Sequence, residues 1–445
     1  MSQTFQIDEQ TYQDLQIVSK NGISVIDYFD KTITDGGKEE LYAIFRSPST
    51  DLSVIEERQA TTQWCLANNK LFPFDAQLIK DIAKYWSSSH DLPQAENHWM
   101  DRFYFWRKYN ANFYYRSRDI ADTLLVIERL NTWLHANVEK QNVPARFQEL
   151  AVHAREVYKR LSAFAKNGSR IAIQTANIDS LDRTIRVELR QQLRDILQLI
   201  YEIDAFCSIA QAARTNGLTF PKLKPKAQQH AMEIVGLYHL FKPDSVRNDF
   251  IFSADKNKWL LTGANMAGKS TFIKALSTVV FLAHAGLPVP AEKITLPVID
   301  GLFTTINIPD DLHAGYSQFY QEAVRLREIF SQLKSDSNAL IVFDELFKGT
   351  NYQDAFDASS EVIRQLKNIP DPYVILSSHI IELADQIDGA GQFVAKCMQT
   401  DTNEKGFPHF TYKLTNGVAQ EKLGMWLLKR SGLFEEMSAK SSEQQ

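Results

Sequence analysis

The 445-residue chain is long enough for two or three domains, each with its own hydrophobic core. Hydrophobic residues at 44% and charged residues at 23% are typical of a soluble globular protein, and Cys65, Cys207 and Cys397 are too far apart for a Cys-x-x-Cys zinc or disulfide pattern. The polar N-terminus lacks a signal-peptide pattern and no apolar stretch is long enough to span a bilayer, so we expect a cytoplasmic protein with no membrane role.

The net charge of −5 conceals an uneven distribution. Between Asp101 and His230 there are 21 Lys and Arg residues against 13 Asp and Glu residues, a local balance of +8. Such a region indicates contact with nucleic acid, and it is equally compatible with a solvated helical surface that carries scattered ion pairs. The aromatic and basic run from Trp99 to Tyr115 leaves a similar choice between stacking on bases and packing in a helical core, and packing is the better interpretation.

The first half of the chain is predicted to be helical. From about Leu15 to His230 apolar residues recur at three- and four-residue steps with few glycines, most regularly between Leu181 and Thr215. Pro221 to Lys226 interrupts this pattern, and beyond it short apolar runs alternate with helices, as in an α/β domain. We therefore predict an all-α domain over residues 1–230, an α/β nucleotide-binding domain over residues 231–436 and a disordered tail over residues 437–445.

A glycine-containing loop follows the apolar run that ends at Leu261 and precedes an amphipathic helix. Residues 262–271 read Thr-Gly-Ala-Asn-Met-Ala-Gly-Lys-Ser-Thr and contain the phosphate-binding pattern Gly-x-x-x-x-Gly-Lys-Ser. The glycines let backbone N–H groups turn toward phosphates, and the helix N-terminus adds donors and partial positive charge. The alternative is a turn that only joins a strand to a helix. We predict that ATP is bound by Gly263, Ala264, Asn265, Met266, Ala267, Gly268, Lys269, Ser270 and Thr271, with Lys269 also acting in catalysis and Ser270 as a Mg²⁺ ligand.

Two later strands are predicted to bring polar groups to the same sheet edge. The apolar run from Ala339 to Phe343 ends in Asp344 and Glu345, and we expect Asp344 to hold Mg²⁺ and Glu345 to orient or deprotonate the attacking water. A third apolar run is followed by His379, which could donate to the γ phosphate or to that water, although a histidine at a strand end is more often structural.

One more candidate precedes a predicted helix. Ser317 is a plausible N-cap, and the alternative is that it forms, with the helix N-terminus, an anion site for a phosphate presented by a second subunit.

At these residues the sequence resembles the ATPase of the DNA mismatch repair MutS family, a branch of the ABC-type ATPases. Residues 262–271 resemble the family's Thr-Gly-Pro-Asn-Met-Gly-Gly-Lys-Ser-Thr, and the Asn-Met pair distinguishes it from most phosphate loops. Residues 344–350 resemble its Asp-Glu-Ile-Gly-Arg-Gly-Thr segment, with Phe347 and Lys348 departing from the Gly-Arg pair. His379 with Glu382 and Leu383 resembles its Thr-His-Tyr-Phe-Glu-Leu segment. In the helical half, residues 15–58 are similar to the start of the family's core domain and residues 203–210 to the end of its lever helix.

The resemblance implies a P-loop, ABC-type α/β ATPase domain preceded by a helical core and lever domain. It further implies a homodimer with two composite ATP sites, each completed by Ser317 of the other subunit, in which hydrolysis moves the levers on double-stranded or branched DNA during repair or recombination. Relatives that read mismatches begin with a separate domain bearing a Phe-x-Glu wedge, whereas here the core pattern starts within about thirty residues of Met1. The alternative function is an ATP-gated dimeric clamp that acts on a protein partner instead of DNA.

Overall fold

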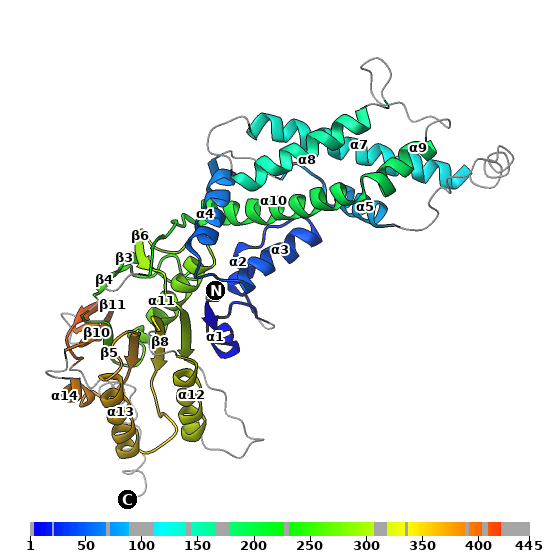
Figure 1. The fold of residues 1–445 in the computed structure, drawn as a ribbon. Helices are drawn as coiled ribbons and strands as arrows, with labels where there is room; N and C mark the ends of the chain where they lie inside the picture. Colours follow the sequence, from blue (N-terminus) through cyan, green and yellow to red (C-terminus); the bar gives the residue numbers. More distant parts are fainter. Residues whose placement is uncertain are drawn as a thin grey trace, which may run out of the picture. The chain divides into compact units, whose positions relative to one another are not determined.

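The structure is a computed structural model that describes residues 4–19, 22–67, 72–88, 110–138, 144–162, 164, 178–226, 231–253, 255–306, 318–333, 337–387, 391–402 and 408–419 (Figure 1). The chain divides into two compact units. The sheet unit comprises Met1–Val25, Ser47–Glu56 and Asn216–Gln445, and the helical unit comprises Ile26–Arg46 and Glu57–Thr215. The chain therefore passes between the units more than once.

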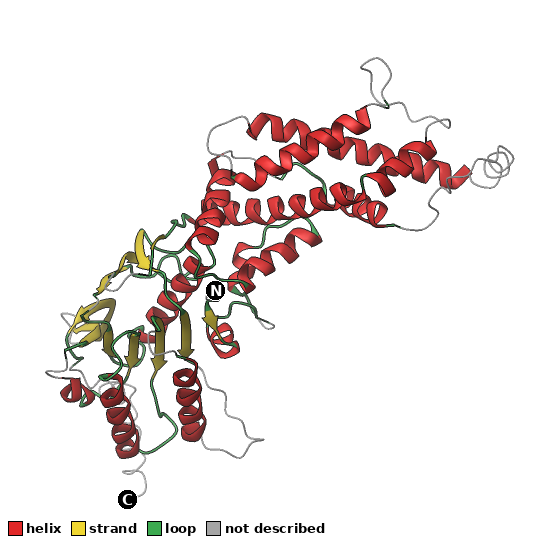
Figure 2. Cartoon of the chain, in the orientation of Figure 1, coloured by secondary structure: helices red, strands yellow, loops and turns green. Residues whose placement is uncertain are grey.

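The helical unit is built from helices alone in the part of it that is described (Figure 2). Its elements are α2 (Val25–Phe29), α3 (Asp35–Arg46), α4 (Leu52–Ala67), α5 (Ala76–Ser87), α7 (Asn110–Val138), α8 (Ala145–Ser162), α9 (Ile178–Arg183), the π-helical turn η1 (Thr184–Glu188) and α10 (Arg190–Asn216). The helices α2, α4 and α10 each cross a unit boundary. The stripe expected between Leu181 and Thr215 is largely buried, at Ile185, Leu193 and Ile200 among others. The helical stretch is interrupted at η1, where the Leu189 N–H bonds to the Thr184 carbonyl, five residues back instead of four.

A buried carboxylate joins α3 to α10 within this unit. Asp204 accepts hydrogen bonds from the N–H groups of Ile33 and Thr34 and from the Thr34 hydroxyl.

Among the described helices α10 has the length and apolar composition that would suffice to cross a membrane, and 67% of its most apolar window is buried in the protein, as in a core helix.

The sheet unit contains a seven-stranded sheet in the order β1-β7-β8-β9-β5-β10-β11, all parallel except for the β10–β11 pair. The strands are β1 (Gln6–Ile7), β7 (Gly301–Thr305), β8 (Ala339–Asp344), β9 (Tyr373–Ser377), β5 (Lys258–Thr262), β10 (Phe393–Thr402) and β11 (Pro408–Asn416). The four central strands β7, β8, β9 and β5 are buried along their whole length, as expected where helices or a second sheet cover both faces.

Helices cover one face of this sheet, and the other face packs on a helix and a smaller sheet. Apolar residues of α12 (Gln318–Gln332), α13 (Tyr352–Leu366) and α14 (Leu383–Ile387) share one core cluster with the larger sheet. On the other side, α11 (Lys269–His284) is buried nearly throughout, and Phe250 and Phe252 pack their rings on Trp259. The smaller sheet has the order β2-β6-β3-β4, formed by β2 (Lys222–Lys224), β6 (Lys293–Pro297), β3 (Met232–Leu237) and β4 (Asn248–Phe252).

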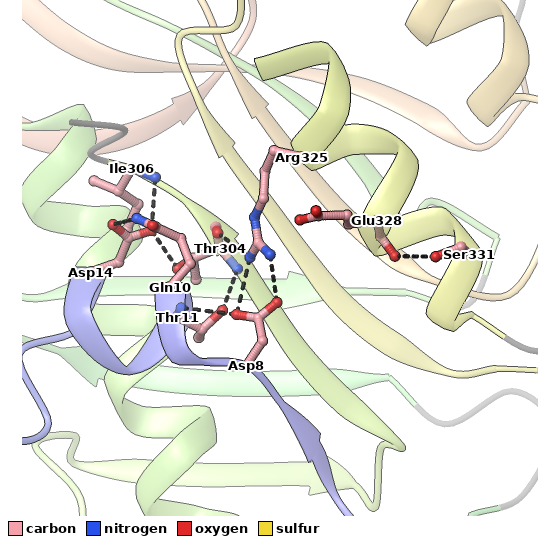
Figure 3. Close-up of polar contacts among 9 residues, drawn as sticks. All are labelled: Asp8, Gln10, Thr11, Asp14, Thr304, Ile306, Arg325, Glu328 and Ser331. Atoms are coloured by element: carbon pink, nitrogen blue, oxygen red, sulfur yellow. Dashed lines mark hydrogen bonds and ion pairs between the residues drawn. The ribbon is translucent and has the colours of Figure 1, made fainter. Parts of the chain in front are cut away.

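The N-terminal segment closes one edge of the larger sheet. β1 pairs in parallel with β7, and α1 (Glu9–Asp14) follows it directly. As Figure 3 shows, the buried Asp14 accepts hydrogen bonds from the Thr304 hydroxyl (2.7 Å) and the Ile306 N–H (2.9 Å) at the end of β7. Arg325 of α12 donates to both carboxylate oxygens of Asp8, at 2.6 and 3.0 Å. Residues some 300 positions apart in the sequence thus hold α1, β7 and α12 together.

Candidate functional site

Three neighbouring parallel strands end side by side at one edge of the larger sheet. β9 lies between β5 and β8, and Ser377 at its end is in register with Leu261 on one side and Asp344 on the other. The glycine-containing loop follows β5, Asp344 and Glu345 end β8, and His379 follows β9. The carboxyl ends of parallel strands are where α/β sheets place ligands. The structure therefore brings the predicted groups of all three strands to one edge.

The loop from Gly263 to Gly268 turns sharply between β5 and α11. Gly263 and Gly268 have φ of +150° and +100°, and Met266 adopts φ +73° in between. Gly268 is needed here for two reasons, because φ is positive and because a Cβ would lie 3.0 Å from the ring of Tyr412 on β11. The Ala267 N–H bonds to the Ala264 carbonyl and closes the turn, while Asn265 and Met266 are exposed on it.

Lys269 folds back over this loop. Its ammonium donates to the Gly263 carbonyl at 2.7 Å, and the residue is only 4% exposed. Ser270 is exposed and Thr271 half-buried in the same first turn of α11, where N–H groups have no intrahelical acceptor. A cation, a hydroxyl and helix N-terminal donors thus meet at one place, which suits an anionic ligand.

Asp344 is held at the end of β8. Its carboxylate accepts a hydrogen bond from the Ser377 hydroxyl of β9 at 2.6 Å, and the residue is buried. Asp344 and Ser270 offer oxygen donors, the type that Mg²⁺ prefers, so the residues present fit this ion. Within the described ranges, no group of three or more His, Cys, Asp or Glu side chains could hold a metal by itself.

Glu345 lies among three basic side chains. Its carboxylate is 3.5 Å from the Lys269 ammonium, 3.2 Å from the Lys348 ammonium and 4.0 Å from His379 Nδ1. Burial acts to raise the pKa of Glu345, but the charges of Lys348 and Lys269 outweigh it and lower this pKa below its ordinary value. His379 itself is mostly exposed, with 57% of its side chain accessible to solvent.

Ser317 and residues 307–316 before it lie outside the described residues, as do residues 437–445. The described chain resumes at Gln318, the first residue of α12. Beside Glu345 there is a recess of about 400 Å³ lined by α1, by the start of α12 and by the turn after β8. Two of its lining residues, Glu322 and Lys348, did not emerge from the sequence as site residues. Lys348 could have been found from its position three residues after Glu345, whereas nothing local marks Glu322.

Comparison with known proteins matches two parts of the chain to one family. Residues 10–210 match the family model of MutS domain III, and residues 259–445 match that of MutS domain V, so that the two matches together span most of the chain. The chain belongs to the MutS family. Apart from β1, the strands of the larger sheet lie in the region of domain V, together with the loop after β5, Asp344, Glu345 and His379.

Relatives within the MutS family are long proteins of which this chain matches only a part. The DNA mismatch repair protein MutS of Thermotoga maritima is 31% identical over 252 residues, which are 55% of this chain and 30% of that protein. The MutS proteins of Leuconostoc citreum and Lysinibacillus sphaericus are 29% and 27% identical over 252 and 275 residues, covering 55% and 59% of this chain and 29% and 31% of theirs. The match therefore spans less than a third of each relative.

Proposed function

We propose that this chain is a Mg²⁺-dependent ATPase with a P-loop, ABC-type fold in its sheet unit, and that it acts on DNA in repair or recombination. The observation that carries the proposal is the meeting of Lys269, Glu345 and Asp344 at the ends of β5 and β8, the parallel strands on either side of β9, beside a Gly-x-x-x-x-Gly-Lys-Ser loop. Membership of the MutS family supports the same activity.

Each side chain has a role that its surroundings favour. Lys269 and the N–H groups of the loop bind the phosphates, and Ser270 with Asp344 would hold Mg²⁺, which when bound neutralises charge on the phosphate oxygens. Glu345 is ionised at neutral pH, since its pKa is lowered, so its carboxylate can orient a water molecule and accept its proton. His379, at the exposed rim, donates toward the transferred phosphate.

We propose further that the sites are shared between two copies of the chain. Ser317 would approach the phosphates bound by the partner subunit, so that ATP stabilises a homodimer and hydrolysis releases it. The helical unit would then grip double-stranded or branched DNA. The balance of +8 between Asp101 and His230, most of which falls in this unit, supports this. Tyr114 and Tyr115, the two residues of the aromatic run whose side chains the structure describes, are 64% and 60% exposed on α7 and available for contact.

The ATPase assignment is tested by measuring ATP hydrolysis in the wild type, Lys269→Ala and Glu345→Ala. We expect both variants to lose roughly a hundredfold or more in kcat, Lys269→Ala through lost phosphate contacts and Glu345→Ala through the lost proton acceptor. Binding of a fluorescent ATP analogue should weaken only in Lys269→Ala. Equal hydrolysis in all three proteins would remove the assignment.

DNA and a protein partner are distinguished by titration. Binding to mismatched, branched and ordinary duplexes is measured with ATP and with ADP over a range of salt concentrations. Phosphate contacts make affinity fall steeply with salt, and that dependence is expected here. No binding even at low salt would favour the ATP-gated clamp on a protein partner.

A further inference from the structure

The turn after β8 adopts a backbone conformation that needs support. Glu345 and Phe347 have φ of +60° and +62°, although neither is a glycine. Residues with a Cβ enter this left-handed region only where their surroundings hold them there. We call residues 345–349 the acidic turn. The place of the Glu345 carboxylate depends on what holds this turn.

The first five residues of α12 contact the acidic turn at three points. Glu322 accepts a hydrogen bond from the Phe347 N–H. The rings of Phe319 and Phe347 pack with their centroids 4.9 Å apart. Gln318 lies so close to Gly349 that a Cβ on Gly349 would be 2.7 Å from the Gln318 Cβ. One polar contact, one apolar contact and one close approach therefore come from a single helix end.

Glu322 is the polar contact among the three, and it is buried. The residue is 4% exposed and lines the same recess as Glu345. Burial raises the pKa of Glu322, while the Phe347 N–H and the nearby Lys348 act in the opposite direction. A carboxylate removed from water needs hydrogen-bond donors, and here the backbone of the acidic turn supplies one.

The helix that carries Glu322 is itself fixed to the sheet. Arg325, one turn further along α12, forms its paired hydrogen bonds with Asp8 and donates to the Thr304 carbonyl at 2.9 Å (Figure 3). Glu322 and Arg325 are three residues apart, so they share a face of α12. The acidic turn is thus tied through Glu322 to an anchored helix.

We propose that Glu322 is a positioning residue for Glu345. By accepting the Phe347 N–H it holds the acidic turn in its left-handed conformation, and this keeps the Glu345 carboxylate beside Lys269 and His379. Glu322 acts through the backbone of the turn and contributes no proton transfer of its own. The inference rests on the ATPase function proposed above and adds to it a residue from another element.

The test compares Glu322→Ala, which removes the acceptor, with Glu322→Gln, which keeps a carbonyl oxygen in its place. Glu328→Ala on the exposed side of α12 is the matched control (Figure 3). The kcat and KM of ATP hydrolysis, the binding of a fluorescent ADP analogue and the thermal unfolding temperature are measured for each full-length protein. We expect Glu322→Ala to lower kcat roughly ten- to a hundredfold with nucleotide affinity changed less than about threefold, Glu322→Gln to recover most of kcat, and Glu328→Ala to match the wild type.

A second pair of variants approaches the same contact from the turn. Gly349→Ala places a methyl group against Gln318 and should also lower kcat while leaving nucleotide binding in place. Adding Gln318→Gly removes the clashing side chain and should restore kcat. This pair keeps the test decisive even where Glu322→Ala fails to fold.

The outcomes separate the two proposals. Where Glu345→Ala abolishes hydrolysis but Glu322→Ala and Gly349→Ala keep kcat within about twofold of the wild type, the positioning role is overturned and the ATPase assignment stands. Equal losses of kcat, nucleotide binding and thermal stability in Glu322→Ala and Glu322→Gln would also overturn it, since they indicate general damage. Hydrolysis that is unaffected by Glu345→Ala overturns both.

Discussion

The candidate site concentrates basic side chains around one carboxylate. Lys269 approaches Glu345 from the start of α11, Lys348 from within the acidic turn and His379 from the end of β9. Partial burial strengthens these interactions relative to those on an open surface, because fewer water molecules screen them. The charge state of Glu345 is therefore controlled in part by Lys348, which has no other role in the proposed chemistry.

Lys348→Met tests this control. Lys348 lowers the pKa of Glu345, so its replacement by a neutral residue raises that pKa and leaves less of the carboxylate ionised at a given acidic pH. We expect the acidic limb of the kcat–pH profile for ATP hydrolysis to move to higher pH. Lys242→Met, an exposed lysine between β3 and β4, is the control and should leave the limb in place. Coinciding limbs for wild type and Lys348→Met would contradict the prediction.

His284, the last residue of α11, makes the stability of the sheet unit depend on pH. The fully buried ring accepts the Ile299 N–H, contacts the Val280 carbonyl and has its pKa lowered by burial to about 4, from an ordinary 6.5. Between these two values the unfolded chain binds a proton that the folded chain does not. Stability should therefore fall as the pH drops below 6.5, by up to about 3 kcal/mol in all.

Thermal unfolding of His284→Leu measures this contribution. The variant should be less stable at neutral pH, because the Ile299 N–H loses its acceptor, but it lacks the proton uptake. The difference in unfolding temperature between wild type and variant should shrink from about pH 7 to about pH 5. A constant difference across this range would rule out His284 as the cause.

At the scale of elements, the strands that carry the site could be predicted from the sequence. The edge strand β1 and the contact of α12 with the acidic turn could not. The run from Ala339 to Phe343 predicts a buried strand by its continuous apolar composition, and the structure confirms it. β1 is two residues long, so it has no periodicity to detect, and it pairs with a strand nearly 300 residues later. Glu322 was missed for a related reason, because its contact with Phe347 depends on how α12 packs and not on its neighbours in sequence.

Asp14→Ala tests whether the N-terminal segment belongs energetically to the sheet. The substitution leaves the buried Ile306 N–H and Thr304 hydroxyl without their acceptor, which should cost about 1–3 kcal/mol per unpaired group. We expect the sheet unit to unfold at a lower temperature. Hydrogen exchange of the backbone N–H groups of β7 measures this loss of stability. Glu39→Ala, an exposed residue of α3, is the control. Unchanged protection of β7 in Asp14→Ala would show that the edge is stable without α1.

At the scale of the whole molecule, the two family matches are continuous stretches of the chain, whereas each compact unit combines separate stretches. The domain III match begins at residue 10, yet Met1–Val25 belong to the sheet unit and β1 extends its sheet. Composition indicates the helical and α/β halves correctly in outline, since it averages over long stretches. It cannot assign a short segment such as Ser47–Glu56, whose membership of the sheet unit depends on pairs such as the Ser49 N–H and the His284 carbonyl.

The proposed dimer predicts that two inactive variants restore ATP hydrolysis when they are mixed. If each ATP site joins the phosphate loop of one subunit to Ser317 of the other, Lys269→Ala and Ser317→Ala should each be inactive alone. In a mixed dimer both defects fall in one site and the second site is intact. Equal mixing should therefore restore about a quarter of the wild-type rate, because half the dimers are mixed and each has one working site.

The measurement is the ATP hydrolysis rate after equal amounts of the two variants are combined and allowed to exchange subunits. Lys269→Ala mixed with Glu345→Ala is the control, since both residues belong to the same subunit's part of the site and every site in that mixture is defective. Recovery in the first mixture alone requires that Ser317 acts across the interface. If neither mixture recovers while Ser317→Ala alone is inactive, Ser317 acts within its own subunit. ATP would then have to stabilise the dimer through other residues.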